Sequence, residues 1–85
     1  MPRYHFDLLN SLGFTCDEEG AELPDVKTAR SEAVRQARPI MAEEVCDGKL
    51  DLTGKIIVRC DGEQILELRF DSAVELVLPD DWDGA

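Results

Sequence analysis

The chain has 85 residues, of which 44% are hydrophobic, and its 19 acidic and 9 basic side chains give a formal net charge of −10. This length suffices for one compact domain but not for a second binding domain beside it. The negative charge repels phosphate backbones and anionic lipid, so nucleic acid and membrane surfaces are not expected as partners.

Alternation of apolar and polar side chains predicts a first strand from Arg3 to Leu8. Successive side chains of a strand point to opposite faces of its sheet, so one face of this strand is expected to be apolar and the other wet. The apolar face carries Tyr4, Phe6 and Leu8, and the wet face carries Arg3, His5 and Asp7.

The same alternation continues after the residues NSLG and predicts a second strand that returns antiparallel to the first. In the expected register, Leu8 pairs with Phe14, and Phe6 pairs with Cys16. Unlike charges then meet on the other face, where His5 faces Asp17 and Arg3 faces Glu19.

The stretch CDEEGAELPD, residues 16–25, places five carboxylates in ten positions and raises the question of a cation site. The candidate metal ligands are Asp17, Glu18 and Glu19. A calcium loop alternates its ligands, whereas these three are consecutive and point in different directions. We therefore interpret the stretch as a solvated turn around Gly20 that ends in a helix cap at Asp25.

One amphipathic helix is predicted to follow Asp25 and to end at Gly48, just past Cys46. Its apolar stripe is Val26, Ala29, Ala33, Ala37 and Ile40. Pro39 lies inside this helix and lacks the N–H that would bond to the carbonyl of Arg35, so a kink or two helical pieces are expected there. A basic arc on the helix consists of Lys27, Arg30, Arg35 and Arg38. We interpret it as a solvated face, with docking of an acidic partner or a phosphate-bearing ligand as the alternative.

The segment KIIVRCDGEQILELRF predicts a second hairpin with a three-residue loop at 60–62. The expected cross-strand pairs are Arg59 with Glu63, Lys55 with Glu67, Ile57 with Ile65, and Ile56 with Leu66. This register joins unlike charges, whereas sliding the strands by two residues places Lys55 opposite Arg69.

The residues SAVE, 72–75, match a capping box and predict a short helical turn, while VELVL could instead form a fifth strand. Residues 1–78 are expected to form the domain, and residues 79–85 a flexible acidic tail. The resulting order β-β-α-β-β predicts an α+β fold of two layers, in which one helix covers one face of an antiparallel sheet.

These features favour a non-enzymatic module that acts through protein contacts. Its expected interaction surface is the sheet face opposite the helix, where it would meet a partner protein or form a homodimer, unless Trp82 and the tail fold back over it. The predicted surface residues are Ile57, Ile65, Arg3, His5 and Arg69. The alternative function is a small-ligand or metal-ion-binding domain centred on the acidic turn.

No catalytic constellation or cofactor motif is present. His5 is the sole histidine, and the alternation places it on the opposite face from Cys16, which argues against a thiol nucleophile with a histidine base. The three widely spaced cysteines do not suggest a disulfide framework. With no membrane-spanning or export signal in the sequence, a cytoplasmic location is expected.

The segments MPRYHFD, DEEGAELPD, ARSEAVRQAR, DGKLDLTGKIIVR and FDSAVEL together resemble a family of short bacterial proteins described as a domain of unknown function. The resemblance extends to about Leu78, and the combination of PRY-x-FD with DEEG-x-ELPD is its most specific part. It implies a small cytoplasmic single-domain protein and carries over no catalytic or binding residues. This chain departs from the family pattern at LNSL, where a polar turn is usual, and at Pro39.

Overall fold

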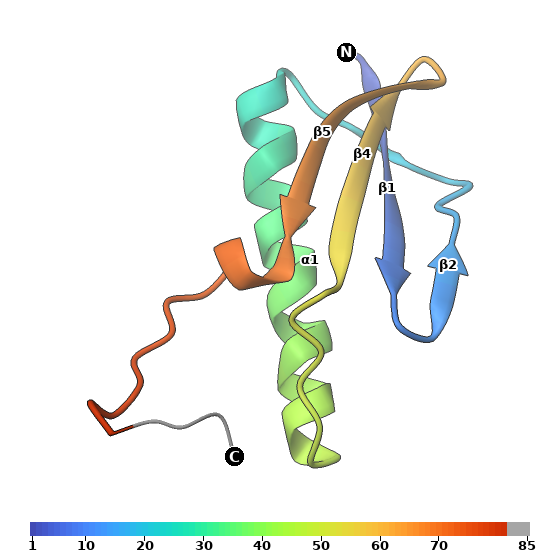
Figure 1. Ribbon diagram of the computed structural model, residues 1–85. Coiled ribbons are helices and arrows are strands. Elements are labelled where there is room, and N and C mark those ends of the chain that lie inside the picture. Colours follow the sequence, from blue (N-terminus) through green and yellow to red (C-terminus); the bar gives the residue numbers. More distant parts are fainter. Residues whose placement is uncertain (82–85) are drawn as a thin grey trace.

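The computed structural model describes residues 1–81, which form one α-helix, five strands and a short 3-10 helix (Figure 1). This arrangement confirms the predicted α+β class. In chain order the elements are β1 (Arg3–Asn10), β2 (Gly13–Thr15), β3 (Ala21–Glu22), α1 (Val26–Cys46), β4 (Lys55–Cys60), β5 (Glu63–Arg69) and the 3-10 helix η1 (Phe70–Ser72).

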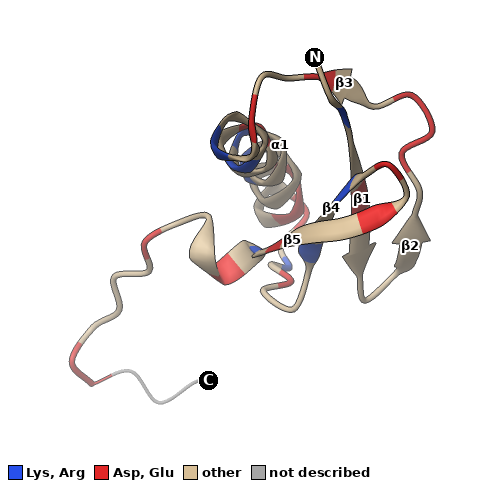
Figure 2. Ribbon diagram, turned by 90° about the horizontal axis from the view of Figure 1, so that it is seen from above, with Lys and Arg blue, Asp and Glu red and all other residues tan. Residues whose placement is uncertain are grey.

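All strand pairs are antiparallel, and the strand order is β2-β1-β4-β5, with β3 also paired to β1. The first strand in the sequence is therefore central in the sheet. Helix α1 packs against β4 and β5 on one side of the sheet (Figure 2). Within residues 1–81 no helix lies on the opposite side, which we call the outer face.

The β1–β2 hairpin is shorter than predicted, and the predicted register is wrong by one residue. Leu8 pairs with Thr15 and Leu9 pairs with Phe14. The reason is a tight connection, since Asn10 pairs with Gly13 and the Asn10 side chain accepts a hydrogen bond from the Leu12 N–H at 2.9 Å. This shift turns Phe14 to the outer face, where its side chain is 56% exposed.

Helix α1 begins and ends where the sequence predicts. Asp25 caps it by accepting a hydrogen bond from the Thr28 N–H at 2.8 Å, and Gly48 follows it with a φ of +88°. The prediction of two helical pieces is wrong, because α1 runs without a break through Pro39. Pro39 is exposed, so water can satisfy the carbonyl that its missing N–H leaves free.

The β4–β5 register also differs from the prediction. Asp61 and Gly62, with φ values of 55° and 80°, form a two-residue turn in which both residues are left-handed. The register shifts between Val58 and Arg59, where β5 carries an extra residue. The pairs beyond this bulge are Val58–Leu66, Ile57–Glu67, Ile56–Leu68 and Lys55–Arg69.

The like-charged pair that argued against this register is tolerated because each cation finds a different carboxylate. Lys55 lies 2.5 Å from Glu67, its diagonal neighbour, and Arg69 lies 2.5 Å from Asp71. The aliphatic side chains decide the register, since it places Ile56 opposite Leu68 on the helix-covered face.

The core lies between α1 and the inner face of the sheet. Its helix side is a stripe of small residues that are fully buried and let the helix approach closely, followed by Met41. The stripe consists of Ala29, Ala33 and Ala37, and the sheet side includes Tyr4, Phe6, Ile56, Val58 and Leu68. Phe70 closes one end against Gly54, where a Cβ would lie only 2.8 Å from the ring.

The helical turn after β5 forms earlier than predicted. The 3-10 helix ends at Ser72, and Ala73 and Val74 pack on the core, so Ser72 does not begin a capping box. Residues 74–78 form no strand. The described part of the predicted tail, residues 79–81, lies outside helices and strands, and Trp82 lies outside the described residues.

Candidate functional site

The acidic loop between β2 and β3 is fixed by the Asp17 carboxylate. That group accepts hydrogen bonds from the backbone N–H groups of Phe6 at 3.0 Å, Gly20 at 3.1 Å and Glu19 at 3.2 Å. Burial alone would raise the pKa of Asp17, but these three donors stabilise the charged form and hold the pKa below its usual 3.8. The carboxylate therefore replaces a missing strand neighbour beside β1.

The main chain of Asp17 joins the same loop to the outer face. Its carbonyl lies 2.9 Å from Nδ1 of His5 and 3.3 Å from the guanidinium of Arg59, and its N–H donates to Asp7 at 2.9 Å. The expected meeting of His5 with Asp17 thus occurs through a carbonyl rather than a carboxylate. Likewise, Arg3 reaches the carbonyl of Glu19 at 2.8 Å.

Asp7 is the clearest exception to the predicted wet face of β1, since it is only 2% exposed. Arg59 covers it with two hydrogen bonds, Nε to Oδ2 at 2.6 Å and a terminal nitrogen to Oδ1 at 3.1 Å. The Arg59 guanidinium lowers the pKa of Asp7, and Asp7 raises that of Arg59.

Sequence reasoning missed this pair because it depends on strand order. Only when β1 lies beside β4 do His5 and Arg59 become direct neighbours, which brings Arg59 diagonally to Asp7. The sequence did contain one signal for this pair, because Asp7 and Arg59 occupy outward positions of two different predicted strands. That signal indicates a contact only once β1 and β4 are known to be neighbours.

Gly20 brings the loop into close contact with β1. Its φ is +70°, and a Cβ at this position would lie 2.7 Å from the Tyr4 carbonyl oxygen and 2.9 Å from the His5 ring. Both the backbone conformation and the lack of space require glycine. The loop is consequently anchored to β1 at Asp17 and at Gly20.

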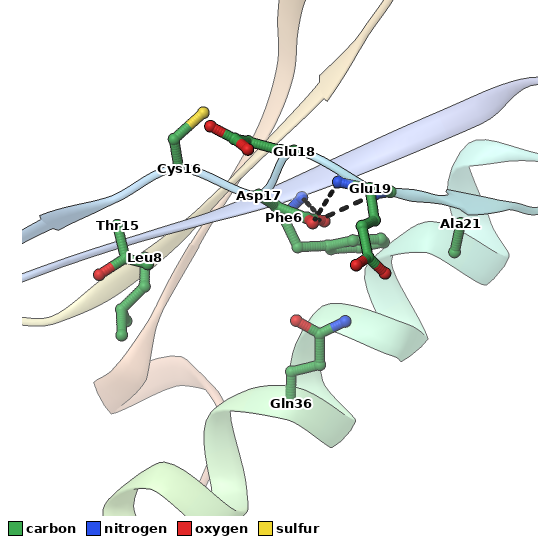
Figure 3. A pocket seen from close by; sticks show the side chains of 10 residues that line it. Phe6, Leu8, Thr15, Cys16, Asp17, Glu18, Glu19, Ala21 and Gln36 are labelled. Atoms are coloured by element: carbon green, nitrogen blue, oxygen red, sulfur yellow. Dashed lines mark hydrogen bonds between the residues drawn. The ribbon is translucent and has the colours of Figure 1, made fainter.

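A groove of about 580 Å³ opens between this loop, β1 and α1 (Figure 3). Figure 3 shows the Glu19 side chain directed toward the helix and the Gln36 side chain directed from α1 toward the loop, whereas Glu18 and Cys16 lie on the other side of the loop. The lining residues are Phe6, Leu8, Thr15, Cys16, Asp17, Glu18, Glu19, Gly20, Ala21 and Gln36.

The three candidate metal ligands do not converge. The Asp17 oxygens are occupied by backbone donors, and Glu18 and Glu19 point to different sides of the loop (Figure 3). Within residues 1–81, no group of three His, Cys, Asp or Glu side chains is placed to hold a metal ion. These three residues therefore line the groove and do not form a metal coordination sphere.

The predicted register placed Cys16 on the opposite face of the sheet from His5, and this prediction is wrong. The one-residue shift of β2 brings Cys16 to the outer side, where its sulfur lies 3.6 Å from the Arg59 guanidinium. His5 directs Nδ1 at the Asp17 carbonyl, and the hydrogen bonds of residues 1–81 include none between His5 and Cys16.

The predicted interaction residues all lie on strands β1, β4 and β5. Alternation from the buried Tyr4, Ile56 and Leu68 turns them to the outer face. Ile57 is half-buried and Ile65 is 38% exposed, while the polar members are Arg3, His5 and Arg69. The shifted β1–β2 register adds the pair Leu9 and Phe14, which sequence analysis did not assign to this face.

Charges on and beside the outer face occur as compensated pairs. Four of the nine lysine and arginine residues lie there, and each is bound to a carboxylate. The pairs are Arg3–Glu22, Lys55–Glu67, Arg59–Asp7 and Arg69–Asp71. Every cation of this face is therefore compensated by a carboxylate, on a chain whose formal charge is −10.

In comparison with known proteins, a family model described as a domain of unknown function, DUF6894, matches residues 3–71. No curated protein and no solved structure matches the chain. Within residues 1–81, none of the helical structure has the length and apolar character needed to cross a membrane.

Proposed function

The chain belongs to this family of unknown function, DUF6894, and we propose that it is a non-enzymatic interaction module that docks another protein through its outer face. The observation that carries the proposal is the sheet face that residues 1–81 leave without a covering element, on which Phe14, Ile57 and Ile65 lie among compensated charges. Exposed apolar side chains gain free energy when a partner removes them from water.

The charges of this face suit docking. The chain as a whole carries a formal charge of −10, whereas on the outer face each cation already has its carboxylate. Docking there displaces water from neutral pairs and apolar side chains, and brings no unpaired charge into the interface. A second copy of the chain is the first partner to test, because the apolar side chains and paired charges of one outer face can meet those of another, with the repulsion between the two acidic chains screened by salt.

The proposal is tested with the double variant Ile57→Thr and Ile65→Thr, which keeps a β-branched side chain in each strand. Val77→Thr is the matched control, since Val77 is 84% exposed and lies outside the sheet. We expect the wild type and the control to associate in sedimentation velocity, or to retain the same protein in affinity capture, and the double variant to lose that association. A wild type that stays monomeric and captures the same proteins as the double variant would refute the proposal.

A further inference from the structure

The groove between the acidic loop and α1 is separate from the outer face, because it opens on the helix side of β1 (Figure 3). It exists because α1 packs over β4 and β5 and leaves the inner side of β1 and β2 partly uncovered (Figure 2). The side chains at its floor are Phe6, Leu8 and Ala21, and Leu8 remains partly exposed. This floor can accept an aliphatic chain.

The charge of the groove has one sign. Its charged lining residues are Asp17, Glu18 and Glu19, and none of its lining residues is Lys, Arg or His. Asp17 is committed to backbone donors, so Glu19, which points toward the helix, is the carboxylate inside the groove that no other side chain of residues 1–81 binds. Glu32 borders it by accepting from the Gln36 amide at 3.2 Å, but Glu32 is already paired with Arg35.

We infer that this groove binds a lysine or arginine side chain presented by a basic, otherwise apolar segment of a partner protein. The aliphatic stem of that side chain lies over Phe6 and Leu8, and its cationic end meets Glu19. On the opposite wall, the amide oxygen of Gln36 can accept a hydrogen bond from the same cationic group. An acidic segment is excluded by repulsion, both locally and from the chain as a whole.

The groove wall is pre-organised for such a ligand. Asp17 and Gly20 hold the loop against β1, so little conformational entropy is lost when the ligand enters. Since the contact with Glu19 is exposed, binding of a single side chain is weak and salt-dependent, with the strongest binding at low ionic strength.

The test uses the isotope-labelled full chain and two short probes, acetyl-Lys-Leu-Lys-Leu-amide and its acidic counterpart acetyl-Glu-Leu-Glu-Leu-amide, followed by NMR. We expect the basic probe alone to shift amide signals of residues 15–21 and of Gln36. Raising the salt from about 20 mM to about 300 mM should weaken binding severalfold. Equal binding of the acidic probe, shifts confined to the outer face, or no shift at all would overturn the inference.

Variants then separate the groove from general attraction by a negative chain. Glu19→Gln is compared with Glu43→Gln, which removes the same charge from an exposed helix position away from the groove. Glu19→Gln should weaken the basic probe about threefold to fivefold, the size expected for one exposed ion pair, while Glu43→Gln should have little effect.

A second variant, Thr15→Tyr, fills the groove from its exposed β2 wall and should also reduce binding. Unchanged binding in both Glu19→Gln and Thr15→Tyr would overturn the inference. Neither position lies on the strands that carry Ile57 and Ile65, so failure here is distinguishable from failure of the outer-face proposal.

Discussion

Arg59 on β4 holds the buried carboxylate of Asp7 on β1 with two hydrogen bonds, at 2.6 and 3.1 Å. The pair crosses the central strands of the sheet and also binds the acidic loop, because Asp7 accepts from the Asp17 N–H and Arg59 reaches the Asp17 carbonyl. A single ionic contact thus supports both the sheet and one wall of the groove.

The first prediction concerns this contact. Asp7→Asn keeps the shape of the side chain but loses the charge-assisted bonds, and we expect it to lower the free energy of unfolding by about 1–3 kcal/mol. Urea denaturation provides the measurement, with the exposed Glu63→Gln as a control that should change stability by less than about 0.5 kcal/mol. A loss no larger than that of the control would show that the buried pair adds nothing to stability.

A second prediction follows from the lowered pKa values of Asp7 and Asp17. In the unfolded chain these carboxyls take up protons near their usual pKa of 3.8, whereas in the folded chain they do so only at lower pH. Their contribution to stability is therefore complete above about pH 5 and decreases as the pH falls through 4 and below. Urea midpoints measured across this range should fall less steeply for the Asp7→Asn and Asp17→Asn variants than for the wild type. Parallel curves would contradict this assignment.

The third prediction tests the close approach of the acidic loop to β1. Gly20→Ala adds a Cβ 2.7 Å from the Tyr4 carbonyl at a φ of +70°, and should cost about 1–3 kcal/mol. Gly48→Ala is the control for backbone conformation alone, because its φ is +88° and no atom lies within 4 Å of the added Cβ. It should cost about 1 kcal/mol. Equal losses of stability would mean that the contact with Tyr4 relaxes freely.

The fourth prediction concerns Pro39, which lies exposed inside an uninterrupted helix. Pro39→Ala restores a hydrogen bond to the carbonyl of Arg35 and should raise the free energy of unfolding by about 1–3 kcal/mol. Ser31→Ala, also exposed on α1, isolates the effect of helix propensity and should add only about 0.5 kcal/mol. If Pro39→Ala gains no more than Ser31→Ala, the helix already accommodates the proline without cost.

Sequence patterns predicted the features that depend on short chain separations. The cap at Asp25, the buried stripe from Ala29 to Ala37 and the stop at Gly48 all follow from the fixed geometry of a helix. The alternation along β1 likewise identified the inner face, because Tyr4 and Phe6 are buried there. These elements required no knowledge of their neighbours.

The hairpin registers and the Asp7–Arg59 contact could not be predicted in the same way. In the second hairpin, charge pairing suggested a three-residue loop, but Asp61 adopts a left-handed φ of 55° and closes a two-residue turn. Lys55 then finds Glu67 diagonally, an arrangement that direct cross-strand pairing does not anticipate. The groove wall also escaped prediction, because the role of Asp17 depends on the free backbone N–H of Phe6.

The central position of β1 beside β4 has a consequence for how the chain folds. Contacts between the two strands link residues far apart in the sequence, such as Asp7 and Arg59, which are 52 positions apart. The middle of the sheet therefore cannot assemble from local segments. Closing so long a loop before any pairing is gained slows the search for the native state. During synthesis on the ribosome, β1 must wait without its main partner until residue 60 has emerged.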